Sequence, residues 1–214
     1  LSGLVGSEMC IRDRRKPAQA LRPDPAYEKA FAQIMARIGH TLGAKRPPKP
    51  VVVCVAGGAA MHFYTGARYT NDIDAKIFAR VMLDPKELQV AYAGADGRTR
   101  LLYLDTQYND SFALLHHGAY DDARLLELAG VDAHRLEVRL LTPLDLAVSK
   151  LARFSAVDRD DIRALAAAGL IDGVALKKRA EAALPDYVGN LERIRNSIEL
   201  AVKLIAPATR RKNK

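Results

Sequence analysis

VVVCVAGGAAM at residues 51–61 and RYTNDID at residues 68–74 decide the fold of this chain. The first stretch is a short, β-branched apolar run that ends in two glycines, which predicts a buried strand, a tight turn and then a helix. In the second, residues i and i+2 of a strand point to the same face, so we expect Asp72 and Asp74 to project side by side. Two carboxylates held that close repel unless a cation lies between them, and oxygen-only ligands favour a hard ion such as Mg²⁺.

The glycines supply the second half of a nucleotide site. Gly57 and Gly58 let the backbone approach a phosphate, and the helix that follows presents its N-terminal N–H groups to it. An ordinary turn and a solvated strand edge remain the alternative, because each element is common singly. Other phosphate or cation motifs are absent from the sequence: there is no Gly-x-x-x-x-Gly-Lys-Ser/Thr run, no calcium loop with its Gly and distal Glu, and no further glycine of a dinucleotide fingerprint.

These residues carry a family resemblance. The Gly-Gly turn followed by Asp-Ile-Asp resembles the active-site signature of the nucleotidyltransferase (polymerase-β-like) superfamily. More narrowly, it is similar to bacterial nucleotidyltransferase-like proteins related to toxins of abortive-infection toxin–antitoxin systems. TPLDLAVSKLA at 142–152 and DRDDI at 158–162 resemble the downstream helical motif of that group, which has a Lys on one helix and an Asp on the next. Taken together, these motifs extend the resemblance over roughly residues 50 to 165.

The resemblance implies an α+β fold, with a nucleotidyltransferase-like mixed β-sheet flanked by helices and followed by a C-terminal helical bundle. It also implies two Mg²⁺ ions held by three carboxylates. Asp105, at the end of an apolar run, is the candidate for the third carboxylate, and Asp110 is the alternative. The expected catalytic residues are Asp72, Asp74, Asp105 and Lys150, with the first three as metal ligands; the expected nucleotide-binding residues are Gly57, Gly58, Arg68, Thr70, Lys150 and Asp161.

The implied activity is Mg²⁺-dependent transfer of a nucleoside monophosphate from an NTP to an acceptor hydroxyl. The toxin relatives imply a tRNA 3′ end as the acceptor and a cognate antitoxin as a partner, while a protein hydroxyl or a small molecule stays open. Two other classes of function remain as alternatives. One is a nucleotide-binding or partner-binding module of the same fold with little turnover, and the other is a basic nucleic-acid-binding protein.

The composition indicates the cellular compartment and the class of partner to expect. The chain has 214 residues, 49% of them hydrophobic, and no apolar run of membrane-spanning length. Two cysteines far apart in sequence do not make a disulfide scaffold, so we expect a reducing cytoplasm and no membrane partner. The net charge of +8 fits either RNA or another nucleic acid as a partner, or basic tails that only keep the protein in solution.

The chain is expected to have three parts. Residues 1–20 are expected to be a disordered or artefactual leader, because residues 1–14 look like a translated sequencing adapter; residues 21–142 form the nucleotidyltransferase-like domain; residues 143–214 are a helical region with a basic tail. Pattern and capping signals predict helices over 25–42, 58–65, 172–184 and 186–205, one from Pro143 and one capped by Asp158, and strands over 51–55, 72–78, 90–93, 100–105 and 137–141. His62 is expected to pack in the core, and His116 and His117 are expected to lie in a loop or at a strand end.

Overall fold

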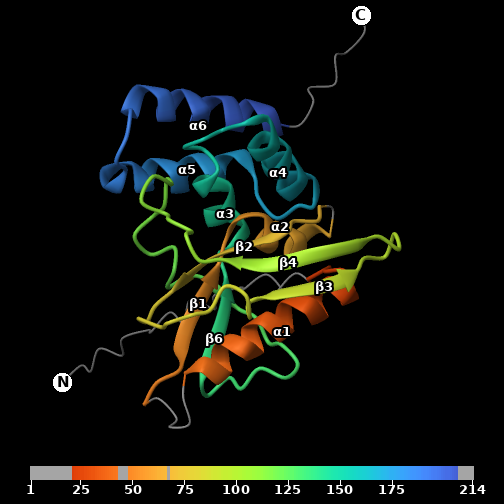
Figure 1. Cartoon of the computed structure of the whole chain (residues 1–214). Coiled ribbons are helices and arrows are strands. Elements are labelled where there is room, and N and C mark those ends of the chain that lie inside the picture. Colours follow the sequence, from red (N-terminus) through yellow and green to blue (C-terminus); the bar gives the residue numbers. More distant parts are fainter. Residues whose placement is uncertain (1–20, 43–47, 67, 207–214) are drawn as a thin grey trace, which may run out of the picture.

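A computed structural model describes residues 21–42, 48–66 and 68–206, so the predicted leader and basic tail lie outside the described residues. The predicted α+β class is confirmed: a six-stranded mixed sheet has helices on one face and a helical region at one end (Figure 1). The strands are β1 (Val51–Val55), β2 (Asp72–Ile77), β3 (Gln89–Ala93), β4 (Thr99–Asp105), β5 (Arg124–Leu125) and β6 (Leu136–Leu140). The helices are α1 (Pro25–Thr41), α2 (Gly57–Thr65), α3 (Pro143–Ser149), α4 (Ala156–Ala167), α5 (Gly173–Ala183), the 3₁₀ helix η1 (Leu184–Asp186) and α6 (Leu191–Ile205).

The sheet has the order β3-β4-β2-β1-β6-β5. β1 pairs antiparallel with β2 and parallel with β6, and β2 pairs parallel with β4. This register gathers Val53, Val55, Ile73 and Leu104 on one face, where all four are buried. Their neighbours in sequence alternate to the opposite face, which carries the acidic residues of β2 and the end of β4. The sheet is therefore two-sided, with an apolar face and a polar face.

Helix α1 covers the apolar face. Asp24 caps its N-terminus by accepting hydrogen bonds from the N–H groups of Ala26 and Tyr27, and Pro25 occupies the first turn. The fully buried side chains of the helix recur at helical spacing, as predicted. They are Tyr27, Phe31, Ile34, Met35 and Ile38. The Tyr27 ring packs edge-on against Phe63 of α2 and Tyr92 of β3, which joins both helices to the sheet.

The helical region packs at the end of the sheet where β2 begins and α2 lies (Figure 1). α3 begins at Pro143, as predicted, with Thr142 as its N-cap. The predicted cap of α4 was wrong: Ser155 is the N-cap, and Asp158 is the third helical residue, whose carboxylate accepts from the Ser155 N–H in a capping box. Asp161 consequently lies in the second turn of α4, away from the N–H groups at the start of the helix.

Two further boundaries differ from the predictions. α6 begins at Leu191 rather than residue 186, because Asn190 caps it and residues 184–186 form η1. The short strand β5 was not predicted, since two residues are too few for a periodic pattern. The hairpin of β3 and β4 is confirmed, and Gly97 provides the left-handed residue of its turn at φ +73°. None of the helices within the described ranges is long and apolar enough to cross a bilayer.

Candidate active site

Three carboxylates share the polar face of the sheet. In the parallel pairing of β2 and β4, Asp74 lies opposite Asp105 and Asp72 lies opposite Tyr103. Neighbouring strands are about 4.8 Å apart, so the Asp74 and Asp105 side chains start from adjacent positions. Burial, together with the nearby charges of Asp72 and Asp105, raises the pKa of Asp74 to about 6. A cation placed beside Asp74 would therefore favour its ionised form.

The Gly-Gly turn packs directly against these carboxylates. Gly57 opens α2 with a φ of +56°, and a Cβ built there would lie 1.8 Å from Asp74 Oδ2. A Cβ on Gly58 would lie 2.8 Å from the Thr70 hydroxyl oxygen, and that hydroxyl donates a hydrogen bond to Asp72. Only glycine fits at either position without displacing a neighbour. The two glycines thus bring the N-terminus of α2 to the start of β2.

A buried cation faces the carboxylates from the helical region. Lys150, the C-cap of α3, is 7% exposed, and its Nζ donates to Asp161 Oδ2 at 2.6 Å. Arg68 donates to the same oxygen at 2.9 Å. The positive charge of Lys150 favours the ionised form of Asp74 and so lowers its pKa, against the larger raising effects of burial and its acidic neighbours. Asp161 thus anchors two cations that come from different segments.

A second ion pair lies beside Lys150, and sequence reasoning missed it as part of the site. Arg153 binds Asp158 through two hydrogen bonds, Nε to Oδ2 at 2.8 Å and Nη2 to Oδ1 at 2.7 Å. Burial alone would raise the pKa of Asp158, but hydrogen bonds from Arg153 and Ser155 lower it to about 2. The Ser155-x-x-Asp158 pattern was a readable capping-box signal for this carboxylate.

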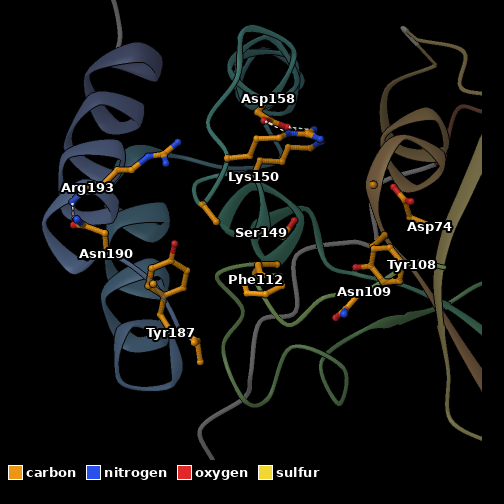
Figure 2. Close-up of a pocket in the computed structure, with 17 residues that line it drawn as sticks. Asp74, Tyr108, Asn109, Phe112, Ser149, Lys150, Asp158, Tyr187, Asn190 and Arg193 are labelled. Atoms are coloured by element: carbon orange, nitrogen blue, oxygen red, sulfur yellow. Dashed lines mark hydrogen bonds and ion pairs between the residues drawn. The ribbon is translucent and has the colours of Figure 1, made fainter.

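A cleft of about 570 Å³ joins these parts (Figure 2). Gly57 and Asp74 form part of one wall, while Lys150 and Arg153 face it from the helical region. Residues that sequence reasoning missed complete the lining. These include Tyr108, Asn109, Phe112, Ser149, Tyr187, Asn190 and Arg193. Most of them come from the loop after β4 and from the segment that enters α6, which carry no periodic signal linking them.

The other predicted residues lie around this cleft. Arg68, Thr70, Asp72 and Asp161 are not among the residues that line it. Asp105 instead lines a neighbouring cleft of about 360 Å³, which shares Tyr108 and Asn109 with the first.

Asp110 also lines the neighbouring cleft, where other side chains already engage its carboxylate. Asp110 Oδ2 accepts from Lys76 Nζ at 2.8 Å and from the Tyr120 hydroxyl. The two candidates for the third carboxylate therefore differ: Asp105 pairs in register with Asp74, whereas Asp110 belongs to an ion pair.

The histidines lie as predicted. His62 is fully buried, its Nε2 accepts from the Asp24 N–H at 3.0 Å, and its Nδ1 donates to the Arg68 carbonyl at 2.7 Å. Burial lowers the pKa of His62, which keeps the ring neutral in this structural role. His116 and His117 lie in the loop between β4 and β5, with their ring centroids 4.0 Å apart and their planes tilted by 31°.

The carboxylates fit Mg²⁺ only in combination with a substrate. Within the described part of the chain, no three His, Cys, Asp or Glu side chains are grouped closely enough to hold a metal ion by themselves. Mg²⁺ is commonly bound through one or two protein carboxylates together with water and substrate phosphates. Asp72 and Asp74 on one strand face, with Asp105 beside them, are oxygen donors of that kind.

The profile of one protein family matches residues 29–203, and the family is described as "nucleotidyltransferase of unknown function (DUF6036)". The chain belongs to this family. No curated protein and no solved structure matches it. The matched span of this DUF6036 protein runs from α1 into α6 and contains the Gly-Gly turn, the three carboxylates and Lys150. The family description names neither a substrate nor a toxin–antitoxin role.

Proposed function

We propose that this DUF6036 protein is an Mg²⁺-dependent nucleotidyltransferase that moves a nucleoside monophosphate from an NTP to an acceptor hydroxyl and releases pyrophosphate. One observation carries the proposal. Asp74 and the Gly57 turn line one side of a cleft, and Asp72 and Asp105 lie beside Asp74 on the same face of the sheet, while Lys150 and Arg153 line the cleft from the helical region. Nucleotidyl transfer needs this juxtaposition of metal ligands and positive charge more than it needs covalent chemistry from side chains.

Each part of the site has a role in the proposal. Asp72, Asp74 and Asp105 would hold Mg²⁺, which supplies positive charge at the attacking and leaving oxygens. The placement of all three on one face of the sheet, with Asp105 in register with Asp74, supports this role. Lys150 and Arg153 neutralise the triphosphate, and the backbone at Gly57 approaches it without a side chain in the way. Asp161 holds Lys150 and Arg68 in place.

We propose an RNA 3′ hydroxyl as the acceptor. The net charge of +8 supports a polyanionic partner, because basic residues gain affinity by releasing counterions from the phosphate backbone. The resemblance to toxins of abortive-infection systems points further to a tRNA end, and with it to a cognate antitoxin.

A labelling assay tests the proposal. The protein is incubated with Mg²⁺, each α-³²P NTP in turn, and a mixture of total tRNA and cell protein. The decisive variant is Asp72→Asn/Asp74→Asn, and the matched control is Asp121→Asn/Asp160→Asn, which makes the same chemical change at exposed positions. We expect label on RNA with the wild type and the control and none with the decisive variant. Label that survives the decisive variant would refute the proposed site.

The remaining outcomes identify the rival functions. Mg²⁺-dependent NTP binding without any labelled product would indicate a binding module of the same fold. Binding to RNA that weakens steeply with salt, ignores NTP and is unchanged in the Asp72→Asn/Asp74→Asn variant would indicate a basic nucleic-acid-binding protein. Label on protein rather than on RNA would retain the chemistry and change the acceptor.

A further inference from the structure

The end of the cleft away from the carboxylates is aromatic. Phe112 comes from the loop between β4 and β5, and Tyr187 from the segment between η1 and α6, yet both line the same cleft (Figure 2). Phe112 is 73% exposed, and Val188, which lines the same cleft, is 70% exposed. Large apolar side chains left uncovered in a cleft gain from burial by a ligand, and such patches mark binding sites.

The backbone around Tyr187 favours a flat platform. A Cβ built on Gly189 would lie 2.6 Å from the Tyr187 Cζ and hydroxyl oxygen, so the ring rests against a backbone that carries no side chain. Next to it, Asn190 Oδ1 accepts from the Arg193 N–H at 2.9 Å as the cap of α6. This hydrogen bond orients the Asn190 side chain, and its Nδ2 group has no acceptor among the described residues. A ring platform and an oriented amide donor therefore lie together at this end.

The two sides of the cleft differ in the groups that they present. Figure 2 places Asp74 on one side, with the Lys150 side chain extending toward it, and places Tyr187, Asn190 and Arg193 on the other side, with Phe112 between them. A nucleoside triphosphate has the same polarity, because its phosphates need cations and its base offers a flat apolar face. Stacking on aromatic side chains tolerates any base, since each base has such a face.

We propose that the aromatic end is the nucleobase subsite of the nucleotidyltransferase, where the base stacks on Phe112 and Tyr187 and accepts a hydrogen bond from Asn190. The triphosphate extends from there toward Lys150, Arg153 and Asp74. This inference rests on the proposed function in taking an NTP as the ligand. It adds the direction in which the nucleotide lies and the residues that bind its base.

The main alternative is the opposite orientation of the nucleotide, with its phosphates at Arg193, which also lines the aromatic end of the cleft. The two directions differ in a measurable way. Inorganic tripolyphosphate has no base, so its affinity reports only the phosphate-binding end. In the proposed direction, tripolyphosphate binding depends on Arg153 and is indifferent to Arg193 and to both rings.

Calorimetric titration of the full chain with Mg²⁺ and either ATP, GTP, CTP, UTP or tripolyphosphate tests the proposal. We expect Phe112→Ala and Tyr187→Ala each to weaken binding of the preferred NTP about tenfold, because one stacked base contributes roughly that factor. Their affinity for tripolyphosphate should match that of the wild type. Phe112→Tyr and Tyr187→Phe should keep NTP affinity. Met82→Ala, at a 97% exposed apolar position outside the cleft, is the control.

Two results would overturn the subsite. One is unchanged NTP affinity in both alanine variants; the other is tripolyphosphate binding that is lost in Arg193→Gln and kept in Arg153→Gln. The titration also separates this inference from the proposed activity. Ring-dependent NTP binding without any labelled product retains the subsite and rejects the transfer. Labelled product with ring-independent binding does the reverse, and a wild type that binds no NTP rejects both.

Discussion

Gly57 and Asp74 are packed so closely that no side chain fits between them: a Cβ on Gly57 would lie 1.8 Å from Asp74 Oδ2. Gly57→Ala should therefore displace the carboxylate and lower nucleotidyl transfer about 100-fold, the loss expected when a reacting group moves by about 1 Å. The measurement is the rate of labelled product formation.

Gly130→Ala is the matched control for this substitution. Gly130 also has a positive φ, at +80°, but a Cβ there meets nothing within 4 Å. Gly130→Ala should lose about 1 kcal/mol of unfolding free energy from its left-handed backbone, and Gly57→Ala should lose more, because its Cβ also displaces Asp74; urea denaturation measures both losses. Only Gly57→Ala should lose activity. If Gly57→Ala were as active as Gly130→Ala, the close packing of Gly57 against Asp74 would not be needed for nucleotidyl transfer.

Asp161 neutralises the buried Lys150 and the half-exposed Arg68. Asp161→Asn should lower the free energy of unfolding by about 3 kcal/mol, because the buried Lys150 loses the nearer of its two carboxylate partners and keeps only Asp158, at 4.0 Å. It should also weaken NTP binding, since Lys150 is no longer held toward the cleft. Asp160→Asn, one residue earlier and 71% exposed, should change stability by less than about 0.5 kcal/mol. Equal unfolding midpoints for the two variants would contradict this account of Asp161.

Asp105 and Asp110 can be separated as candidates for the third metal ligand. Asp105 is in register with Asp74, so Asp105→Asn should lower transfer about 100-fold and leave stability almost unchanged. Asp110 is bound by Lys76 and Tyr120, so Asp110→Asn should cost about 1 kcal/mol of stability and keep most of the activity. Labelling rates and urea denaturation of both variants measure these two effects. If Asp110→Asn abolished transfer and Asp105→Asn kept it, Asp110 would be the third metal ligand.

The buried Asp158 predicts a dependence of stability on pH. Its pKa is about 2 in the folded protein against an ordinary value of 3.8, so the folded state binds this proton less readily than the unfolded state. The stabilisation is complete above the unfolded pKa and is lost as the pH falls through the folded one. The difference corresponds to about 2 kcal/mol.

Asp158→Asn isolates this contribution. Between pH 5 and pH 2, the unfolding free energy of the wild type should fall by about 2 kcal/mol more than that of the variant. Asp160→Asn should follow the wild type, because its carboxylate is exposed. Urea denaturation at stepped pH measures all three proteins. If the unfolding free energies of the wild type and Asp158→Asn fell in parallel with pH, the ion pair of Arg153 and Asp158 would not cause this loss of stability in acid.

The elements of the fold were largely predictable because local periodicity encodes them. The apolar run of β1, the alternation in β2 and the helical spacing of Phe31, Ile34 and Ile38 each depend on a few neighbouring residues. Boundaries were less predictable where two caps competed. Ser155 and Asp158 are both residues that favour the start of a helix. Their reciprocal hydrogen bonds make Ser155 the N-cap, and residue preferences alone do not predict these bonds.

The sequence by itself determined that Asp72 and Asp74 share a strand face and that a glycine turn precedes them, since strand alternation and backbone freedom are properties of adjacent residues. Only the tertiary structure decided which residues join them. Asp105 lies opposite Asp74 through the register of two strands, and the loop that carries Phe112 meets the segment that carries Tyr187 through chain packing across a long sequence separation. No local pattern specifies such contacts, because they depend on how the sheet and the helical region are packed together.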